Sequence, residues 1–131
     1  MTTQTFDIIQ FVLRLTLAAA FVFMGVTHFL PAVQRTMAAM VPPRMRRAGI
    51  LSPRNLVIFT GVCEIAGGLG LLFPPTMLAA GICLVVFLVA VFPANAYAAA
   101  HPKRFGRVAV PLIPRLIGQL ALIALVVLAV V

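Results

Sequence analysis

Four long apolar runs divide the chain, and polar or proline-rich connections separate them. The runs cover roughly residues 7–30, 55–73, 76–99 and 110–131. A helix of about 20 apolar residues spans the hydrocarbon core of a bilayer, so each run is long enough to cross. We see no internal repeat. The pattern therefore predicts an all-α fold, an integral membrane four-helix bundle that forms a single domain over residues 1–131.

The longest connection, residues 31–54, contains a second and shorter apolar pattern. Val33, Met37, Met40 and Val41 recur at helical spacing, and Pro42 ends the run. This spacing predicts a short amphipathic helix, an interfacial segment that lies in the headgroup region. An irregular loop is the alternative.

Composition supports the membrane assignment. Of the 131 residues, 63% are hydrophobic and 9% are charged, and the mean hydropathy is +1.18. A soluble domain of this size could not bury so much apolar surface. The N-terminal residues include no basic cluster, so we expect no cleaved signal peptide.

The net charge of +8 comes from basic residues that lie mainly between the apolar runs. The connections 31–54 and 101–110 together hold eight of the ten basic residues, whereas the turn at Pro74 and Pro75 carries no charge. This placement suits a lipid bilayer with anionic headgroups, and we expect no nucleic-acid partner. By the positive-inside rule, the two basic connections are cytoplasmic and both termini lie outside.

Glu64 is the most informative single residue, because it lies in the middle of the second run. The only other acidic residue is Asp7. A carboxylate at membrane depth is costly, so it should face protein or a water-filled cavity. Residues three and four positions from Glu64 are mostly small, whereas the opposite side is branched and apolar. The small face comprises Thr60, Gly61, Gly67, Gly68 and Leu71. It predicts a close approach by a second helix.

The first run also has a polar stripe at spacings of three and four, which we expect to face inward. The stripe comprises Asp7, Gln10, Arg14, Ala18, Phe21, Gly25 and His28. Together with polar residues of the third and fourth runs, it predicts a polar cluster inside the bundle, mostly in its cytoplasmic half. The candidate ligand-binding residues are Glu64, His28, Asn95, Arg14, Arg115 and Gln119.

The roles of these candidates stay open at the level of sequence, and no catalytic residue is assigned. Glu64 could carry a proton or contact a ligand, or it could form a structural ion pair with Arg14 or Arg115. No metal site is expected, because the two histidines lack ligand spacing. Cys63 and Cys83 form no C-x-x-C motif and are expected to be small buried residues.

Several segments, in order, resemble the DoxX family of small bacterial membrane proteins, in its DoxX-like branch. They are Gly25-x-x-His28-Phe29-x-Pro31, Val41-Pro42-Pro43, Thr60-Gly61-x-x-Glu64-x-x-Gly67-Gly68, Leu71-Leu72-x-Pro74 and Phe92-Pro93-Ala94-Asn95-x-Tyr97. The resemblance extends over roughly residues 10 to 125. It implies a four-helix fold in the bacterial cytoplasmic (inner) membrane.

The resemblance also implies an association with sulfur and thiol redox, including a subunit of a thiosulfate:quinone oxidoreductase and an oxidative-stress membrane complex. We therefore expect a subunit of a membrane redox assembly that binds a quinone-like or other lipophilic molecule near Glu64, with other redox subunits as partners. The residues themselves predict no cofactor, and a quinone is the one that the resemblance suggests. The absence of a cysteine pair argues against direct thiol chemistry. Self-association is left open.

Three other functions compete with this expectation. The chain could be a structural or assembly protein without a ligand. It could be a lipid-modifying enzyme in which Glu64 works with His28 or Asn95. A proton-coupled exporter is the third alternative, although Arg14 in the first run would repel cations.

Overall fold

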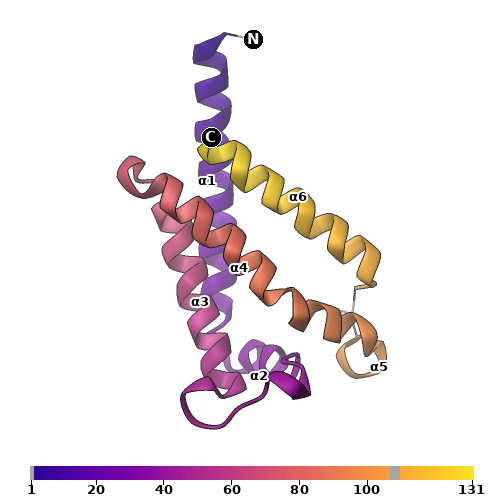
Figure 1. Cartoon of the computed structure of the whole chain (residues 1–131). Coiled ribbons are helices and arrows are strands. Elements are labelled where there is room, and N and C mark those ends of the chain that lie inside the picture. The colour runs from indigo at the N-terminus through magenta and orange to yellow at the C-terminus, as the bar shows by residue number, and fades with distance from the viewer. Residues whose placement is uncertain (1, 107–109) are drawn as a thin grey trace.

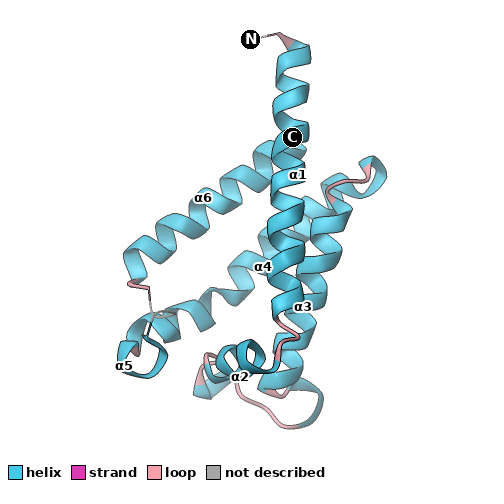
Figure 2. Ribbon diagram, turned by 180° about the vertical axis from the view of Figure 1, so that it is seen from behind, coloured by secondary structure: helices cyan, strands magenta, loops and turns pink. Residues whose placement is uncertain are grey.

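The computed structural model describes residues 2–106 and 110–131, and these residues form helices joined by short turns. Figures 1 and 2 show the chain from two sides. The α-helices are α1 (Thr3–Thr27), α2 (Pro31–Ala39), α3 (Pro53–Gly70), α4 (Pro74–Ala100), α5 (Pro102–Phe105) and α6 (Leu112–Val130). Two 3₁₀ turns, η1 (Pro43–Met45) and η2 (Gly49–Leu51), lie between α2 and α3. The all-helical prediction is confirmed for the described residues.

The helix boundaries follow from caps and prolines. The Thr2 hydroxyl accepts a hydrogen bond from the Thr5 amide at 3.1 Å, and the Ser52 hydroxyl caps α3 in the same way. Proline stands in the first turn of α2, α3, α4 and α5, where its missing N–H costs nothing. For this reason α3 and α4 begin two residues before the predicted runs.

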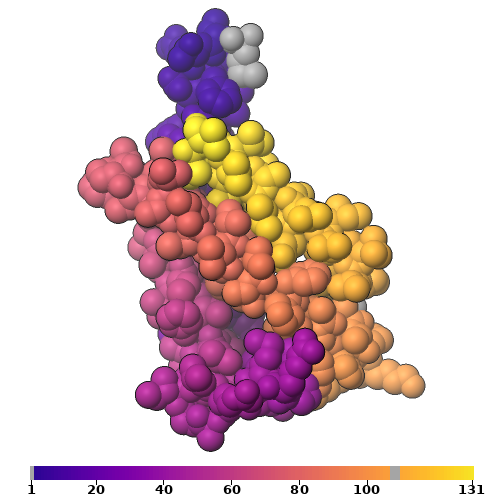
Figure 3. All heavy atoms as spheres, in the orientation of Figure 1, coloured from indigo at the N-terminus to yellow at the C-terminus, as the bar shows by residue number. Residues whose placement is uncertain are grey.

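The four long helices pack in a simple order. Helix α3 lies along α1, α4 packs on α3, and α6 packs on α4 and returns to α1 near its own C-terminus (Figure 1). The main apolar core joins these four helices through Leu17, Phe21, Leu71, Leu84 and Val126. The first turns of α1 project beyond the other helices (Figure 3).

Three of the four long helices, namely α1, α4 and α6, are long and apolar enough to cross a membrane. Helix α3 is not among them, because its 18 residues include Arg54, Asn55 and Glu64. The surface of the bundle nevertheless carries many large apolar side chains, including Phe59 of α3 and Ile113 of α6. Such a surface is typical of a protein whose solvent is lipid. The expectation that Cys83 is buried is wrong, because it lies exposed on this surface.

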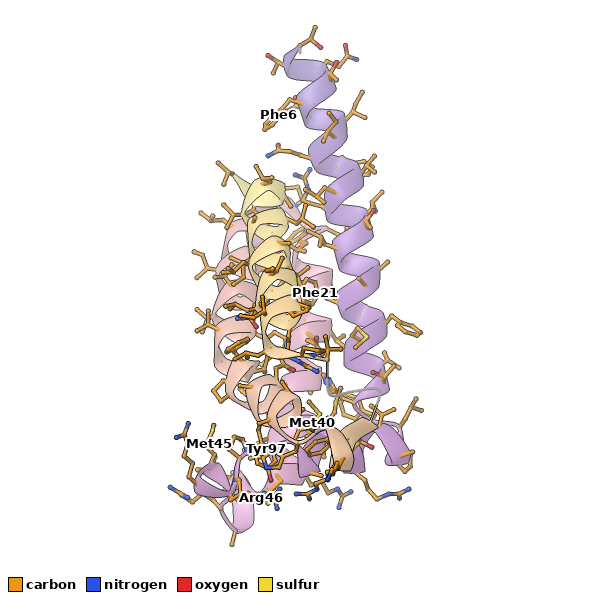
Figure 4. All side chains as sticks on the ribbon, turned by 90° about the vertical axis from the view of Figure 1, so that its right-hand side faces the viewer. Phe6, Phe21, Met40, Met45, Arg46 and Tyr97 are labelled. Atoms are coloured by element: carbon orange, nitrogen blue, oxygen red, sulfur yellow. The ribbon has the colours of Figure 1, made fainter. Side chains whose placement is uncertain are left out.

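The first connection contains the predicted short helix. It is α2, which forms over Pro31–Ala39, so the irregular-loop alternative is wrong for these residues. Met40 follows its end and packs with Ala98 of α4 and Phe105 of α5 in a second apolar cluster. In Figure 4, Met40, Arg46 and Tyr97 gather at the same end of the molecule, whereas Phe6 lies at the opposite end on the projecting part of α1. The two basic connections therefore meet.

Candidate functional site

Glu64 and His28 face each other where α3 crosses α1. The Oε2 atom of Glu64 lies 2.9 Å from Nδ1 of His28, and the two residues are only 7% and 6% exposed. Neither atom has a hydrogen-bond partner among the described residues. The contact is therefore a buried polar contact between α1 and α3.

Two glycines set the distance between these helices. A Cβ atom added to Gly61 would lie 2.8 Å from the His28 Cβ and 3.0 Å from the Gly25 carbonyl oxygen. A Cβ on Gly25 would lie 2.8 Å from the Gly61 carbonyl oxygen and 3.1 Å from the Glu64 Cβ. Because only glycine leaves room for so close an approach, the crossing at Gly25 and Gly61 brings the imidazole to the carboxylate.

The rest of the small face of α3 is also buried, as predicted. A Cβ on Gly68 would lie 3.1 Å from the Ala18 carbonyl oxygen of α1, and one on Gly67 would meet Leu84 of α4. Thr60 is the exception, since it is only half-buried. The hydrophobic pattern thus placed Glu64 on the correct side of α3.

Arg14 does not pair with Glu64, although such an ion pair was one of the alternatives left open for this carboxylate. Arg14 instead donates from Nη1 to the Ala129 carbonyl oxygen at 2.9 Å, and Gln10 donates to the carbonyls of Leu128 and Val131, both at 2.9 Å. These carbonyls lie in the last turn of α6, where intrahelical donors are missing and the helix dipole attracts positive charge. Arg14 therefore serves the end of α6, far along α1 from His28.

The prediction that the stripe of α1 faces inward is only partly correct. Ala18, Phe21, Gly25 and His28 are buried, whereas Asp7 is exposed. Asp7 lies near the start of α1, and the first turns of this helix project beyond the other helices (Figure 1).

The Arg115 side chain likewise bonds to groups other than Glu64. Its Nη1 donates to Oδ1 of Asn95 at 2.9 Å, and its Nε donates to the Val110 carbonyl oxygen at 3.2 Å. Gln119, one turn further along α6, is half-buried and forms no side-chain hydrogen bond with another described residue. The candidates therefore separate into a Glu64–His28 pair, an Asn95–Arg115 pair, and Arg14 and Gln119 apart from both.

The Asn95–Arg115 pair lines a pocket of about 440 Å³, which lies between α1, α2, α4 and α6. Its lining residues are Met24, Ala32, Val33, Thr36, Met37, Met40, Asn95 and Arg115. An apolar pocket with a few convergent polar groups is typical of sites for small molecules, whose volumes are about 300–1,000 Å³. Glu64 and His28 line neither this pocket nor a smaller one beside α5.

A family model described as a domain of unknown function (DUF8561) matches residues 17–130. This chain belongs to the DUF8561 family. No curated protein and no solved structure matches it significantly. The matched range includes both polar pairs of this DUF8561 chain and leaves Arg14 outside it.

Sequence reasoning missed most of the pocket lining of the DUF8561 domain. Val33, Met37 and Met40 were expected on a short amphipathic helix in the headgroup region, and they line the pocket together with Met24 of α1. The helical spacing of these residues could have indicated the pocket, because an apolar stripe can face protein as well as lipid. Flexible methionine side chains suit a site that adapts to a lipophilic molecule.

Proposed function

We propose that this chain is a DoxX-like subunit of a membrane redox or oxidative-stress assembly, and that it binds a quinone-like lipophilic molecule. The pocket between α1, α2, α4 and α6 is the binding site. The observation that carries this proposal is the Asn95–Arg115 pair, a guanidinium and an amide in contact within a pocket whose other lining residues, apart from Thr36, are apolar. A quinone offers carbonyl oxygens to such donors and an apolar tail to the methionines.

The proposal places the chain in the bacterial inner membrane with four crossings. The 18 residues of α3 extend about 27 Å at 1.5 Å per residue, close to the thickness of a hydrocarbon core. Its one acidic residue is buried against α1, so α3 presents no carboxylate to lipid. The contacts between the two basic connections support a single cytoplasmic side that carries both, with the termini outside.

The binding site is proposed at Arg115 rather than beside Glu64. Glu64 lines neither described pocket, and it faces His28 where α3 crosses α1. We assign the Glu64–His28 pair a structural role in holding α1 to α3.

A lipid-modifying enzyme remains the second candidate, and one observation favours it. A carboxylate and an imidazole 2.9 Å apart form a pair that can exchange a proton with a substrate. In this function the substrate would have to reach Glu64 and His28, and Asn95 would take no part, because it contacts Arg115 instead.

Binding of decylubiquinone to the detergent-purified protein tests the proposal. We expect Arg115→Gln to weaken binding about 10- to 100-fold, since a hydrogen bond to a charged group contributes about 1.5–3 kcal/mol. Arg44→Gln is the matched control: Arg44 is exposed and lines neither described pocket, so binding should not change.

Glu64→Gln separates the two candidate functions. Decylubiquinone binding that survives this substitution and fails in Arg115→Gln supports the proposed site. Binding that fails in Glu64→Gln and survives in Arg115→Gln would place the lipophilic molecule beside Glu64 and His28, as the enzyme candidate requires. No binding by the wild-type protein contradicts the quinone proposal.

A further inference from the structure

A second concave site lies where the two basic connections meet, between α2 and α5. Its volume is about 260 Å³, and Arg35, Thr36, Ala39, Arg104 and Phe105 line it. Arg35 and Arg104 lie far apart in the sequence, so folding rather than a local basic run brings them to one hollow.

Arg104 is held in place by aromatic neighbours. Its Nη1 donates to the Tyr97 hydroxyl at 3.2 Å, and its guanidinium carbon lies 5.3 Å from the centre of the Phe105 ring. Phe105 is itself buried, and its ring packs edge-on against Tyr97. A guanidinium fixed in this way loses little conformational freedom when it binds an anion.

The charges in this hollow have no carboxylate side chain to balance them. The chain has two acidic residues: Glu64 is buried beside His28, and Asp7 is exposed near the start of α1. Several other arginines of the first connection form hydrogen bonds within the protein that stabilise the connection. Arg46 and Arg47 donate to backbone carbonyls, and Arg54 donates to the Gln34 amide oxygen.

We propose that this hollow binds the phosphate group of an anionic lipid, with Arg35 and Arg104 contacting it from the two connections. A guanidinium matches phosphate geometry with two parallel N–H donors, and a zwitterionic headgroup carries the same phosphate together with a cation that two arginines repel. In the proposed topology the site lies at the cytoplasmic headgroup level, where anionic lipids concentrate. The inference uses that topology but not the quinone site: the two linings share Thr36, but Arg115 lines only the quinone site, and Arg35 and Arg104 line only this hollow.

The test compares two double variants of the detergent-purified protein that lose equal charge from the same two connections. Arg35→Gln with Arg104→Gln removes both site arginines. Arg44→Gln with Lys103→Gln removes two exposed basic residues that do not line the hollow. Binding of phosphatidylglycerol and of phosphatidylcholine is measured by native mass spectrometry at several lipid concentrations, and by thermal shift in 0.15 M salt.

We expect phosphatidylglycerol to bind the wild-type protein and the Arg44/Lys103 variant equally. The Arg35/Arg104 variant should bind it at least about 100-fold more weakly, since each charge-assisted hydrogen bond that is lost weakens binding about tenfold or more. Equal weakening of both double variants would overturn the site, because it would show only a diffuse effect of charge. Equal binding of phosphatidylcholine would overturn it as well.

Inorganic phosphate distinguishes the source of the ligand. Stabilisation by millimolar phosphate that depends on Arg35 and Arg104, with no added effect of phosphatidylglycerol, supports the site and assigns it to a free anion. Decylubiquinone binding should stay unchanged in the Arg35/Arg104 variant, so a failure of this proposal is distinguishable from a failure of the quinone site.

Discussion

The crossing of α1 and α3 can be tested by adding one methyl group, in the substitution Gly61→Ala. The new Cβ would lie 2.8 Å from the His28 Cβ and 3.0 Å from both the Gly25 carbonyl oxygen and the His28 Nδ1. Two of these atoms belong to the backbone or are bonded directly to it, so they cannot rotate away. The helices must separate, and the Glu64–His28 contact must lengthen.

The expected cost follows from two opposing terms. Forcing a methyl group into a packed contact costs about 1–3 kcal/mol. Replacing glycine by alanine inside a helix contributes about 0.8–1.0 kcal/mol in the other direction. Gly61→Ala should therefore lower the free energy of unfolding by up to about 2 kcal/mol.

Gly118→Ala is the matched control. Gly118 lies inside α6, and a Cβ there would meet nothing within 4 Å. The Gly118→Ala variant gains the same helix preference without the steric cost. The difference between the free energies of unfolding of the two variants therefore isolates the packing cost of about 1–3 kcal/mol. Unfolding in mixed micelles, followed by circular dichroism, measures both. Equal free energies of unfolding for the two variants would refute the close crossing.

Two further outcomes are expected from the polar contacts. Alanine variants at Glu64 and His28 should show a coupling free energy of about 0.5–3 kcal/mol in a double-mutant cycle. The control pair, Glu64 and Asn95, should show almost none. A larger coupling for the control pair would show that the Glu64–His28 contact is not formed. Arg14→Leu should speed amide hydrogen exchange in the last turn of α6 about tenfold, because the Ala129 carbonyl loses a charged donor. Thr16→Val is the control and should leave this exchange unchanged, because the Thr16 hydroxyl bonds within α1. Unchanged exchange in Arg14→Leu would show that this arginine does not hold the end of α6.

Much of the fold was predictable, because the signals were local. Run length and proline positions gave the helices to within a few residues, and the glycines around Glu64 gave the buried face of α3. A small residue every third or fourth position has one strong physical use, which is close packing of helices.

The pairing of the polar groups was harder, because it depends on which helices cross and at what level. Arg14 and Glu64 share the inward side of the bundle, but α1 crosses α3 at Gly25 and meets α6 near Arg14. Spacing along one helix does not contain that information. The pocket was missed for the same reason, since four separate helices line it.

The central claim is that α3 crosses the membrane with Glu64 turned toward α1. It is tested most directly by labelling single cysteines with a membrane-impermeant maleimide in a variant without Cys63 and Cys83. Thr76→Cys, in the exposed first turn of α4, should react from outside intact cells, whereas Arg44→Cys and Lys103→Cys should react only after permeabilisation. Labelling of all three positions from the same side would show that α3 does not cross, and would contradict the account.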